Sequence, residues 1–187
     1  MARLGLPTAS EFSTILAKGR DGSDSKTRKT YMRKLAGEII TGKPTEGYTN
    51  AAMERGHEME GEARAAYEFE REIECELVGF IRNGQKGCSP DSLVGNDGLL
   101  EIKTKLPHLF IEAVERGSFP PEHFAQCQGQ IWVSEREWCD LVIYWPGMPK
   151  FIMRTHRDDK YIMSLSEAVD KFNDELAELV EKVRAYV

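Results

Sequence analysis

The sequence contains no long hydrophobic run and no recognisable export signal. None of the apolar stretches in its 187 residues approaches the roughly 20 residues that a membrane helix needs. The first segment, MARLGLPTAS, lacks the apolar core and cleavage pattern of a signal peptide. These absences argue against membrane insertion and secretion, so we expect a cytoplasmic protein.

Cysteine and histidine are scarce and follow no metal-binding pattern. The four cysteines lie 13, 39 and 12 positions apart, which matches no CxxC pair, and the four histidines form no HExxH motif. In a reducing compartment such cysteines are more often free buried thiols than disulfides. We therefore assign them no chemical role.

Positive charge is also in short supply, since the formal net charge is −6. This balance argues against a protein that coats nucleic acid without specificity. The charges are unevenly distributed, however: residues 18–34 hold seven basic residues and two aspartates, whereas residues 54–76 hold nine glutamates and three arginines. One end of the molecule is therefore suited to a polyanion, although two solvated helix faces of opposite sign explain the pattern equally well.

What the sequence does contain is a clear succession of helical and strand patterns. Apolar spacing and capping residues predict helices that start at a capping box of Thr8 and Glu11, span about 26–41, 49–69, 107–116 and 121–134, and start at a second capping box of Ser164 and Glu167. Alternating patterns predict strands at 73–80, 86–95, 99–105, 138–145 and 150–156, with a hairpin turn at 96–98.

Helices before and after a short sheet predict an α/β (α+β) fold with a central mixed β-sheet flanked by helices. The hydrophobic content of 41% and the charged content of 30% are those of a folded soluble domain. At this length we expect a single domain over residues 1–187. Two very small domains are the alternative.

Three residues around the predicted central hairpin carry the chemistry. A strand period of two puts Glu101 and Lys103 on one face, while Ile102 points into apolar packing on the other. Asp91 lies across the hairpin, so two carboxylates can meet where oxygen ligands and water hold a hard divalent cation. Phosphodiester hydrolysis uses such a metal to activate water, and a cation such as Lys103 to orient that water or offset developing charge. The set predicts a metal-dependent DNA nuclease.

The spacing of these residues, PD followed by nine residues and then ExK, is the PD-(D/E)xK nuclease signature. The string is short and common, and the alternative is a turn aspartate beside an exposed charge pair of little energetic value. Three details favour the nuclease. The motif lies on a hairpin between apolar strands, a preceding helix carries Glu60 on a stripe of small and aromatic residues, and a following helix contains Gln126.

The order of short motifs along nearly the whole chain resembles that of the phage lambda type recombination exonucleases, the YqaJ-like viral recombinases of the PD-(D/E)xK superfamily. The shared elements are Arg3-Leu-Gly, Thr8-Ala-Ser10-Glu, a basic helix ending in Thr41-Gly42, Arg55-Gly56 followed by Glu60 and Ala63-Arg64, Ser89-Pro90-Asp91, Glu101-x-Lys103, and Ala125-Gln126-x-Gln128 followed by Trp132-Val133. Such a series is hard to obtain by chance. Ser92 and Arg55 depart from the family pattern, since a glycine and an aromatic residue commonly stand there, but neither change removes a metal ligand.

The resemblance implies a role for each matching residue. The metal site and the catalytic set would consist of Asp91, Glu101, the backbone carbonyl of Ile102, Lys103, Gln126 and Glu60. Mg²⁺ would be the cofactor, with Mn²⁺ as a substitute. Arg3, Ser10 and Ser89 would hold a DNA phosphate near the 5′ end. An arginine can grip a phosphate bidentately and a helix start favours anions, although a frayed terminal arginine and an ordinary cap residue are equally simple explanations.

Motif and resemblance together predict a Mg²⁺-dependent 5′ to 3′ exonuclease that digests one strand of linear double-stranded DNA and leaves 3′ overhangs for recombination by strand annealing. The resemblance further implies a ring-shaped homotrimer on DNA ends, a single-strand annealing protein as partner, and a phage or prophage origin. Three alternatives stay open: a structure-specific or restriction-type endonuclease on the same core, a non-catalytic DNA-binding subunit, and a metal phosphatase for small substrates. The intact acid and lysine residues count against the second, and the third leaves the basic region 18–34 unexplained.

Overall fold

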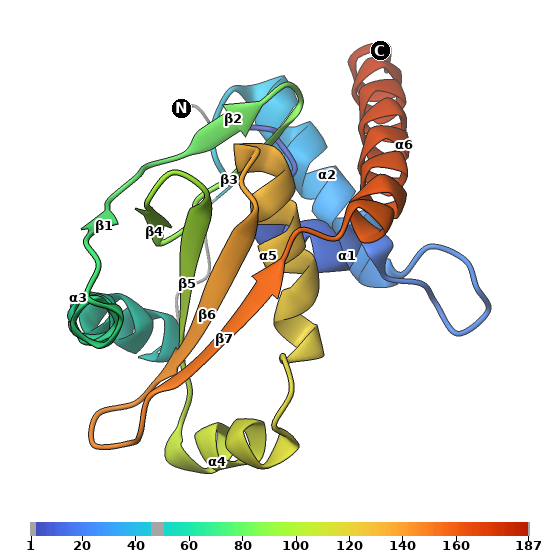
Figure 1. Cartoon of the computed structure of the whole chain (residues 1–187). Helices are drawn as coiled ribbons and strands as arrows, with labels where there is room; N and C mark the ends of the chain where they lie inside the picture. The colour runs from blue at the N-terminus through green and yellow to red at the C-terminus, as the bar shows by residue number, and fades with distance from the viewer. Residues whose placement is uncertain (1–2, 46–50, 187) are drawn as a thin grey trace.

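A five-stranded mixed sheet forms the centre of the computed structural model, which describes residues 3–45 and 51–186 (Figure 1). The strand order is β1-β4-β5-β6-β7; β5 and β6 are parallel and all other neighbours are antiparallel. The strands are β1 (Cys75–Glu76), β4 (Ser92–Val94), β5 (Gly98–Thr104), β6 (Trp138–Tyr144) and β7 (Phe151–His156). A separate antiparallel pair consists of β2 (Ile81–Asn83) and β3 (Lys86–Cys88).

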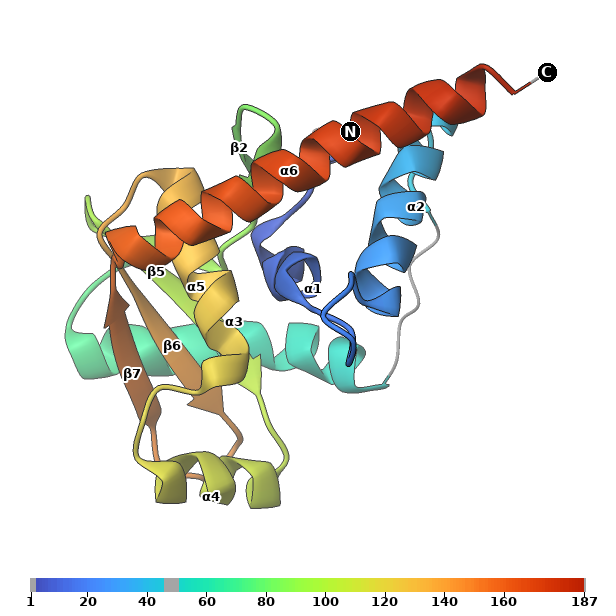
Figure 2. The same cartoon turned by 90° about the vertical axis from the view of Figure 1, so that its right-hand side faces the viewer.

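Helices cover both faces of this sheet, which confirms the predicted fold class (Figures 1 and 2). One face carries α3 (Ala51–Arg71) and the other carries α5 (Pro121–Ser134). Beyond α5 lie the short 3-10 helix η1 (Ala9–Glu11), α1 (Phe12–Leu16), α2 (Lys26–Thr41) and the long α6 (Asp159–Arg184). The remaining helix, α4 (Pro107–Arg116), lies between β5 and α5 in the chain and below the end of the sheet in Figure 1.

Strand β5 divides its side chains between the two helical layers. Leu99 belongs to the apolar cluster under α5, whereas Leu100 and Ile102 belong to the cluster under α3. Since successive side chains alternate between the faces of a sheet, Glu101 and Lys103 share the α5 face with Leu99. The predicted separation of Ile102 from the two charged residues is therefore present in the structure.

The ends of α2, α4 and α5 agree with the predicted ranges, and local signals explain this for α2 and α5. The side chain of Ser25 accepts the N–H of Arg28 at the start of α2, and Gly42 ends that helix with a φ of 66°. Helix α5 starts at Pro121, whose missing N–H costs nothing in a first turn. The predicted start of the third helix at Thr49 or Asn50 lies outside the described residues. No helix in the described part of the chain is long and apolar enough to cross a membrane.

Both predicted capping boxes are wrong. The Thr8 side chain makes no capping hydrogen bond to η1. The last helix starts at Asp159 rather than near Ser164, because the side chain of Asp158 accepts an N–H of its first turn. Ser164 lies inside the helix, where its hydroxyl donates to the carbonyl one turn earlier.

Two strand predictions are only partly correct. Of residues 73–80, only Cys75–Glu76 forms a strand, and residues 86–95 split into β3 and β4, which belong to different sheets. Pro90 lies at the break and has no N–H to donate to a ladder. The hairpin turn lies at 95–97, and Gly98 is the first residue of β5. Any Cβ at Gly98 would overlap the ring of Trp138.

Candidate active site

Asp91 and Glu101 face one another because of the register of the β4–β5 hairpin. Ser92 pairs with Leu100, so Asp91, one residue earlier, lies opposite Glu101, one residue later. The Oδ2 atom of Asp91 accepts the N–H of Ile102 at 2.6 Å, which fixes this carboxylate beside β5. The structure therefore brings the two predicted carboxylates together at the end of the hairpin.

Glu101 is buried, and side chains from β5 and α5 hold it. Only 3% of its surface is exposed. Its Oε1 atom lies 2.7 Å from Nζ of Lys103 and accepts a hydrogen bond of 2.6 Å from Nε2 of Gln126. The lysine and the glutamine thus converge on one carboxylate oxygen, as members of a single polar cluster under α5.

The electrostatics of this cluster favour an additional positive charge. Burial and, after it, the neighbouring charge of Glu101 together raise the pKa of Asp91 to about 7. Burial works against the charged form of Lys103, but the ion pair with Glu101 outweighs it and raises the lysine pKa. One permanently charged lysine therefore faces two carboxylates. Ionising both Asp91 and Glu101 is energetically unfavourable unless another cation is present.

Glu60 on α3 is connected to the hairpin through Arg64. The guanidinium of Arg64 pairs with the Glu60 carboxylate and donates to the backbone carbonyl of Asp91 at 3.3 Å. Its Nε also donates to the hydroxyl of Ser92 at 2.8 Å. Ser92, one of the two departures from the family pattern, is fully buried. Through this hydrogen bond it helps to hold Arg64 in place. Glu60 lies at the edge of the site, where 30% of its side chain is exposed.

Gln130 is a member of the site that was not predicted from the sequence. Its Nε2 donates to Oε2 of Glu101 at 2.6 Å. The available signal was the spacing of four from Gln126, which puts both amides on one face of α5. Gln128, between them, points away and binds the end of β7 instead.

The oxygen atoms at the hairpin suit a small divalent cation. The N–H and C=O of a strand residue point to the same side, so the carbonyl of Ile102 faces the side where its N–H meets Asp91. Mg²⁺ accepts carboxylate and carbonyl oxygens and retains several waters. Within 3–45 and 51–186, no three His, Cys, Asp or Glu side chains form a ready cage. Water or substrate oxygens would complete the coordination of a metal held by Asp91 and Glu101.

Comparison with known proteins decides the family. Residues 1–137 match the model of the YqaJ-like viral recombinase domain. The chain belongs to this family.

Solved structures agree with that assignment. An alkaline exonuclease (LHK-Exo) from Laribacter hongkongensis is 36% identical, with a TM-score of 0.88 over 98% of this chain and 93% of that one. LHK-Exo in complex with dAMP gives a TM-score of 0.89 at the same identity. A phage related exonuclease from Haemophilus somnus shares the fold at 15% identity and a TM-score of 0.73, over 95% of this chain and 96% of that one. No curated protein matches the chain. Family and near-complete match together identify a DNA nuclease of the phage exonuclease type.

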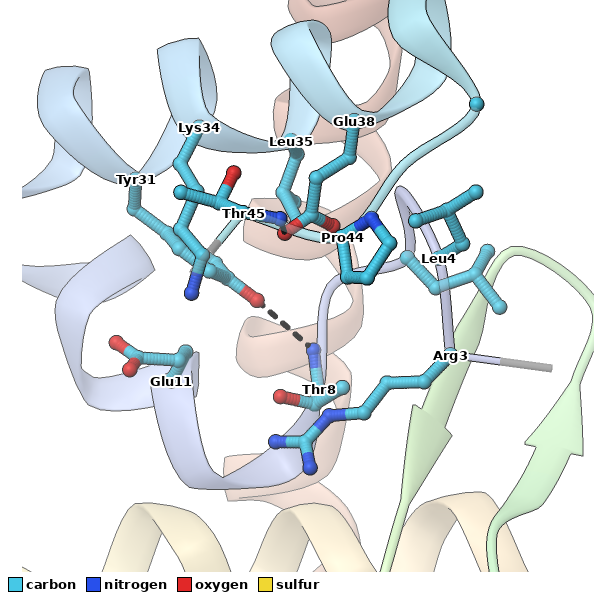
Figure 3. A pocket seen from close by; sticks show the side chains of 12 residues that line it. Arg3, Leu4, Thr8, Glu11, Tyr31, Lys34, Leu35, Glu38, Pro44 and Thr45 are labelled. Carbon is cyan, nitrogen blue, oxygen red and sulfur yellow. Dashed lines mark hydrogen bonds between the residues drawn. The ribbon is translucent and has the colours of Figure 1, made fainter. Parts of the chain in front are cut away.

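Within the described residues, none of the predicted phosphate-binding residues of this YqaJ-family chain forms a hydrogen bond with Asp91 or Glu101. Arg3 lines a pocket of about 420 Å³ between the N-terminal segment and α2 (Figure 3). Ser10 and Ser89 are exposed, and the parallel bridge between Thr8 and Gly87 sets their two segments side by side. In the described residues no hydrogen bond joins Arg3 to either serine. The structure thus places the three in one region without bringing their side chains into contact.

The wall of that pocket carries charges of both signs. Arg3 and Lys34 contribute positive groups, and Glu11 and Glu38 contribute carboxylates. Figure 3 shows the hydroxyl of Tyr31 directed at the backbone of Thr8, with which it makes a hydrogen bond of 3.1 Å. The Glu38 carboxylate is engaged by two backbone N–H groups, those of Gly5 and Thr45. Glu38 thus fixes the pocket wall through backbone contacts on both sides of α2 in the sequence.

Proposed function

We propose that this nuclease is a Mg²⁺-dependent 5′ to 3′ exonuclease that digests one strand of linear double-stranded DNA and leaves 3′ single-stranded overhangs. The observation that carries the proposal is the pairing of half-buried Asp91 with buried Glu101, with Lys103 beside them. The whole activity would reside in a single domain over residues 1–187. The overhangs would serve homologous recombination by strand annealing, in keeping with the recombinase name of the family.

Asp91, Glu101 and the carbonyl of Ile102 would hold the cation, and Mn²⁺ would serve in place of Mg²⁺. The bound metal would neutralise the scissile phosphate and lower the pKa of the attacking water. Metal binding should change the protonation of Asp91 most, because a carboxyl with a pKa of about 7 is half protonated at neutral pH before the metal binds.

Lys103 would place a permanent positive charge beside the reacting phosphate. Its ion pair with Glu101 fixes the ammonium group, and its raised pKa keeps it charged. A preorganised cation in a buried site stabilises charge that develops on phosphate oxygens. Gln126 would support this arrangement by holding Glu101, and Glu60 would add negative potential that attracts the metal.

End recognition would involve Arg3, Ser10 and Ser89. These residues would hold a phosphate near the 5′ end while the hairpin site cuts the same strand. The dAMP in one LHK-Exo structure supports a mononucleotide product. We further propose a homotrimeric ring that acts on double-stranded DNA ends together with a single-strand annealing protein, because enclosure would keep a chain of net charge −6 on DNA despite its acidity.

The decisive experiment compares three substrates with Mg²⁺: linear duplex labelled at the 5′ or 3′ end, the same DNA as a closed circle, and a small phosphate ester. We expect early release of the 5′ label as mononucleotide and an intact circle. Cutting of the circle would instead identify an endonuclease, and early loss of the 3′ label would reverse the polarity. Hydrolysis of a small phosphate ester but not of DNA would identify a phosphatase.

Lys103→Ala tests whether the hairpin is the cutting site. Removing one electrostatic stabiliser costs about 10²–10³ in turnover, so we expect a loss of that size with DNA-end binding retained. Lys150→Ala is the matched control, because Lys150 forms an ion pair with Glu70 on the outside of the fold. Undiminished cutting by Lys103→Ala would place the site elsewhere.

A further inference from the structure

Gln130 is an amide side chain buried in the interior. Only 1% of its surface is exposed, and its Nε2 donates to Oε2 of Glu101 at 2.6 Å. Its Oε1 is 3.9 Å from the thiol of Cys139, which donates to it weakly. The amide orientation follows from chemistry, because a carboxylate only accepts hydrogen bonds and must therefore face the NH₂ group.

The two glutamines of α5 hold opposite oxygens of Glu101. Gln126 donates to Oε1, which also meets Lys103, and Gln130 donates to Oε2. A carboxylate has about four lone-pair positions, and these contacts occupy three of them. One position is left for another ligand.

We propose that Gln130 is a positioning residue that sets the affinity of the metal site by locking the carboxylate of Glu101 in one orientation. The inference rests on the proposed function, since it takes Glu101 as a metal ligand. With both oxygens held by side chains of α5, Glu101 has a single lone-pair position left, which would be the one available to a metal. Gln130 touches neither metal nor DNA and acts only through Glu101.

The same helix supplies a matched control. Gln128 is also fully buried, but its amide binds Thr155 and the carbonyl of His156, and its oxygen accepts the N–H of Asp158. Loss of either glutamine removes buried hydrogen bonds from α5 and lowers stability. Only loss of Gln130 alters the surroundings of Glu101.

The test is a titration of metal-free protein with Mn²⁺ in the absence of DNA, followed by the electron paramagnetic resonance signal of free Mn²⁺. Partners that orient a metal ligand are typically worth about 10–100-fold in affinity. We expect Gln130→Leu to raise the dissociation constant for Mn²⁺ by about 10-fold or more, and Gln128→Leu to keep the wild-type value while its melting temperature falls. In cleavage assays Gln130→Leu should need correspondingly more Mg²⁺, with turnover largely restored at saturation.

A second variant at Gln130 controls for effects of misfolding. Gln130→Met keeps the length of the side chain without its donor, and circular dichroism and thermal unfolding report whether it is folded. Wild-type Mn²⁺ affinity in a folded Gln130 variant, or an equal loss of affinity in Gln128→Leu, would overturn the inference. Glu101→Gln separates this failure from that of the proposed function: if it binds Mn²⁺ like the wild type, the metal is not held at Glu101 at all.

Discussion

Two buried carboxylates on neighbouring strands have opposite surroundings. Glu101 on β5 is 3% exposed and Asp140 on β6 is fully buried. Asp140 pairs in register with Leu100, so it faces α3 while Glu101 faces α5. Arg154 binds Asp140 with two hydrogen bonds of 2.7 and 2.9 Å, and the hydroxyl of Tyr67 adds a third of 2.8 Å.

The difference lies in the balance of charge around each group. Asp140 has a guanidinium in a bidentate pair, so its charge is matched by the protein itself. Glu101 shares the single charge of Lys103 with Asp91, and its other partners, Gln126 and Gln130, are neutral amides. Asp140, whose charge is balanced by Arg154, connects β6 to α3 and β7. Asp91 and Glu101, which share one lysine, have room for an additional cation. Substitutions at the two positions should therefore have opposite effects on activity and stability.

Glu101→Gln should have the largest effect, and it should fall on activity. The variant loses the proposed metal ligand and the partner of Lys103, so we expect turnover to fall by more than the roughly 10²–10³-fold typical of one electrostatic group. Stability of the metal-free protein should not fall in parallel, because the repulsion of Asp91 disappears as well. Initial rates of nucleotide release and urea unfolding measure the two quantities. A loss of rate below 10-fold would contradict the assignment.

Asp140→Asn should show the reverse pattern. Losing the charge of Asp140 should cost about 2 kcal/mol, because hydrogen bonds to a charged group contribute about 1.5–3 kcal/mol and solvent already screens the exposed side chain of Arg154. We expect urea unfolding to show that loss, while the folded variant cuts DNA at nearly the wild-type rate. Tyr67→Phe is the milder comparison, with a loss of about 1 kcal/mol for one hydrogen bond. A large loss of cutting rate with unchanged stability in Asp140→Asn would contradict the proposed difference between Asp140 and Glu101.

Only one of these two sites could be predicted from the sequence. The hairpin turn is short, so the opposition of Asp91 and Glu101 followed from strand alternation and the turn between them. The buried role of Asp140 did not, because its partner Tyr67 is separated from it by 73 residues. The sequence shows that Asp140 is a polar residue inside an apolar strand pattern, but not which distant side chain forms a hydrogen bond with it.

The glutamines of α5 show the same limit within one helix. The segment AQCQGQ places glutamine at every second position, and helical spacing puts Gln126 and Gln130 on one face with Gln128 on another. Which of these faces meets β5 is decided by tertiary packing. The strand predicted at 73–80 failed for a related reason, since alternation does not reveal that its partner β4 has only three residues.

The unmatched charge should also make stability depend on pH. In metal-free protein the pKa of Asp91 is about 7 against an ordinary value of 3.8, so between these values the folded state binds more protons than the unfolded chain. The contribution of Asp91 to stability must then fall as pH rises, by about 2 kcal/mol between pH 5 and 7. Burial lowers the pKa of His123 to about 4, and the contribution of this histidine rises over the same interval, so the effect of Asp91 is measured as a difference between two proteins. The unfolding free energy of the wild type minus that of Asp91→Asn, from urea unfolding in EDTA, should fall as pH rises from 5 to 7. Saturating Mg²⁺ at pH 7 should reverse this fall, and a difference that rises over the same interval would contradict the predicted sign.

The smallest effect is expected at Ser92, which connects the hairpin to Arg64 and so to Glu60. Ser92→Ala removes the hydroxyl that accepts from Arg64 at 2.8 Å, while the guanidinium keeps its contacts with Glu60 and the carbonyl of Asp91. We expect a loss of about 1 kcal/mol in unfolding free energy and a modest rise in the Mg²⁺ concentration needed for half-maximal cutting. Ser92→Gly restores the residue common in the family and should be less stable still, because glycine adds freedom to the unfolded chain. If Ser92→Ala matches the wild type in both measurements, the hydroxyl of Ser92 plays no part in positioning Arg64 at the site.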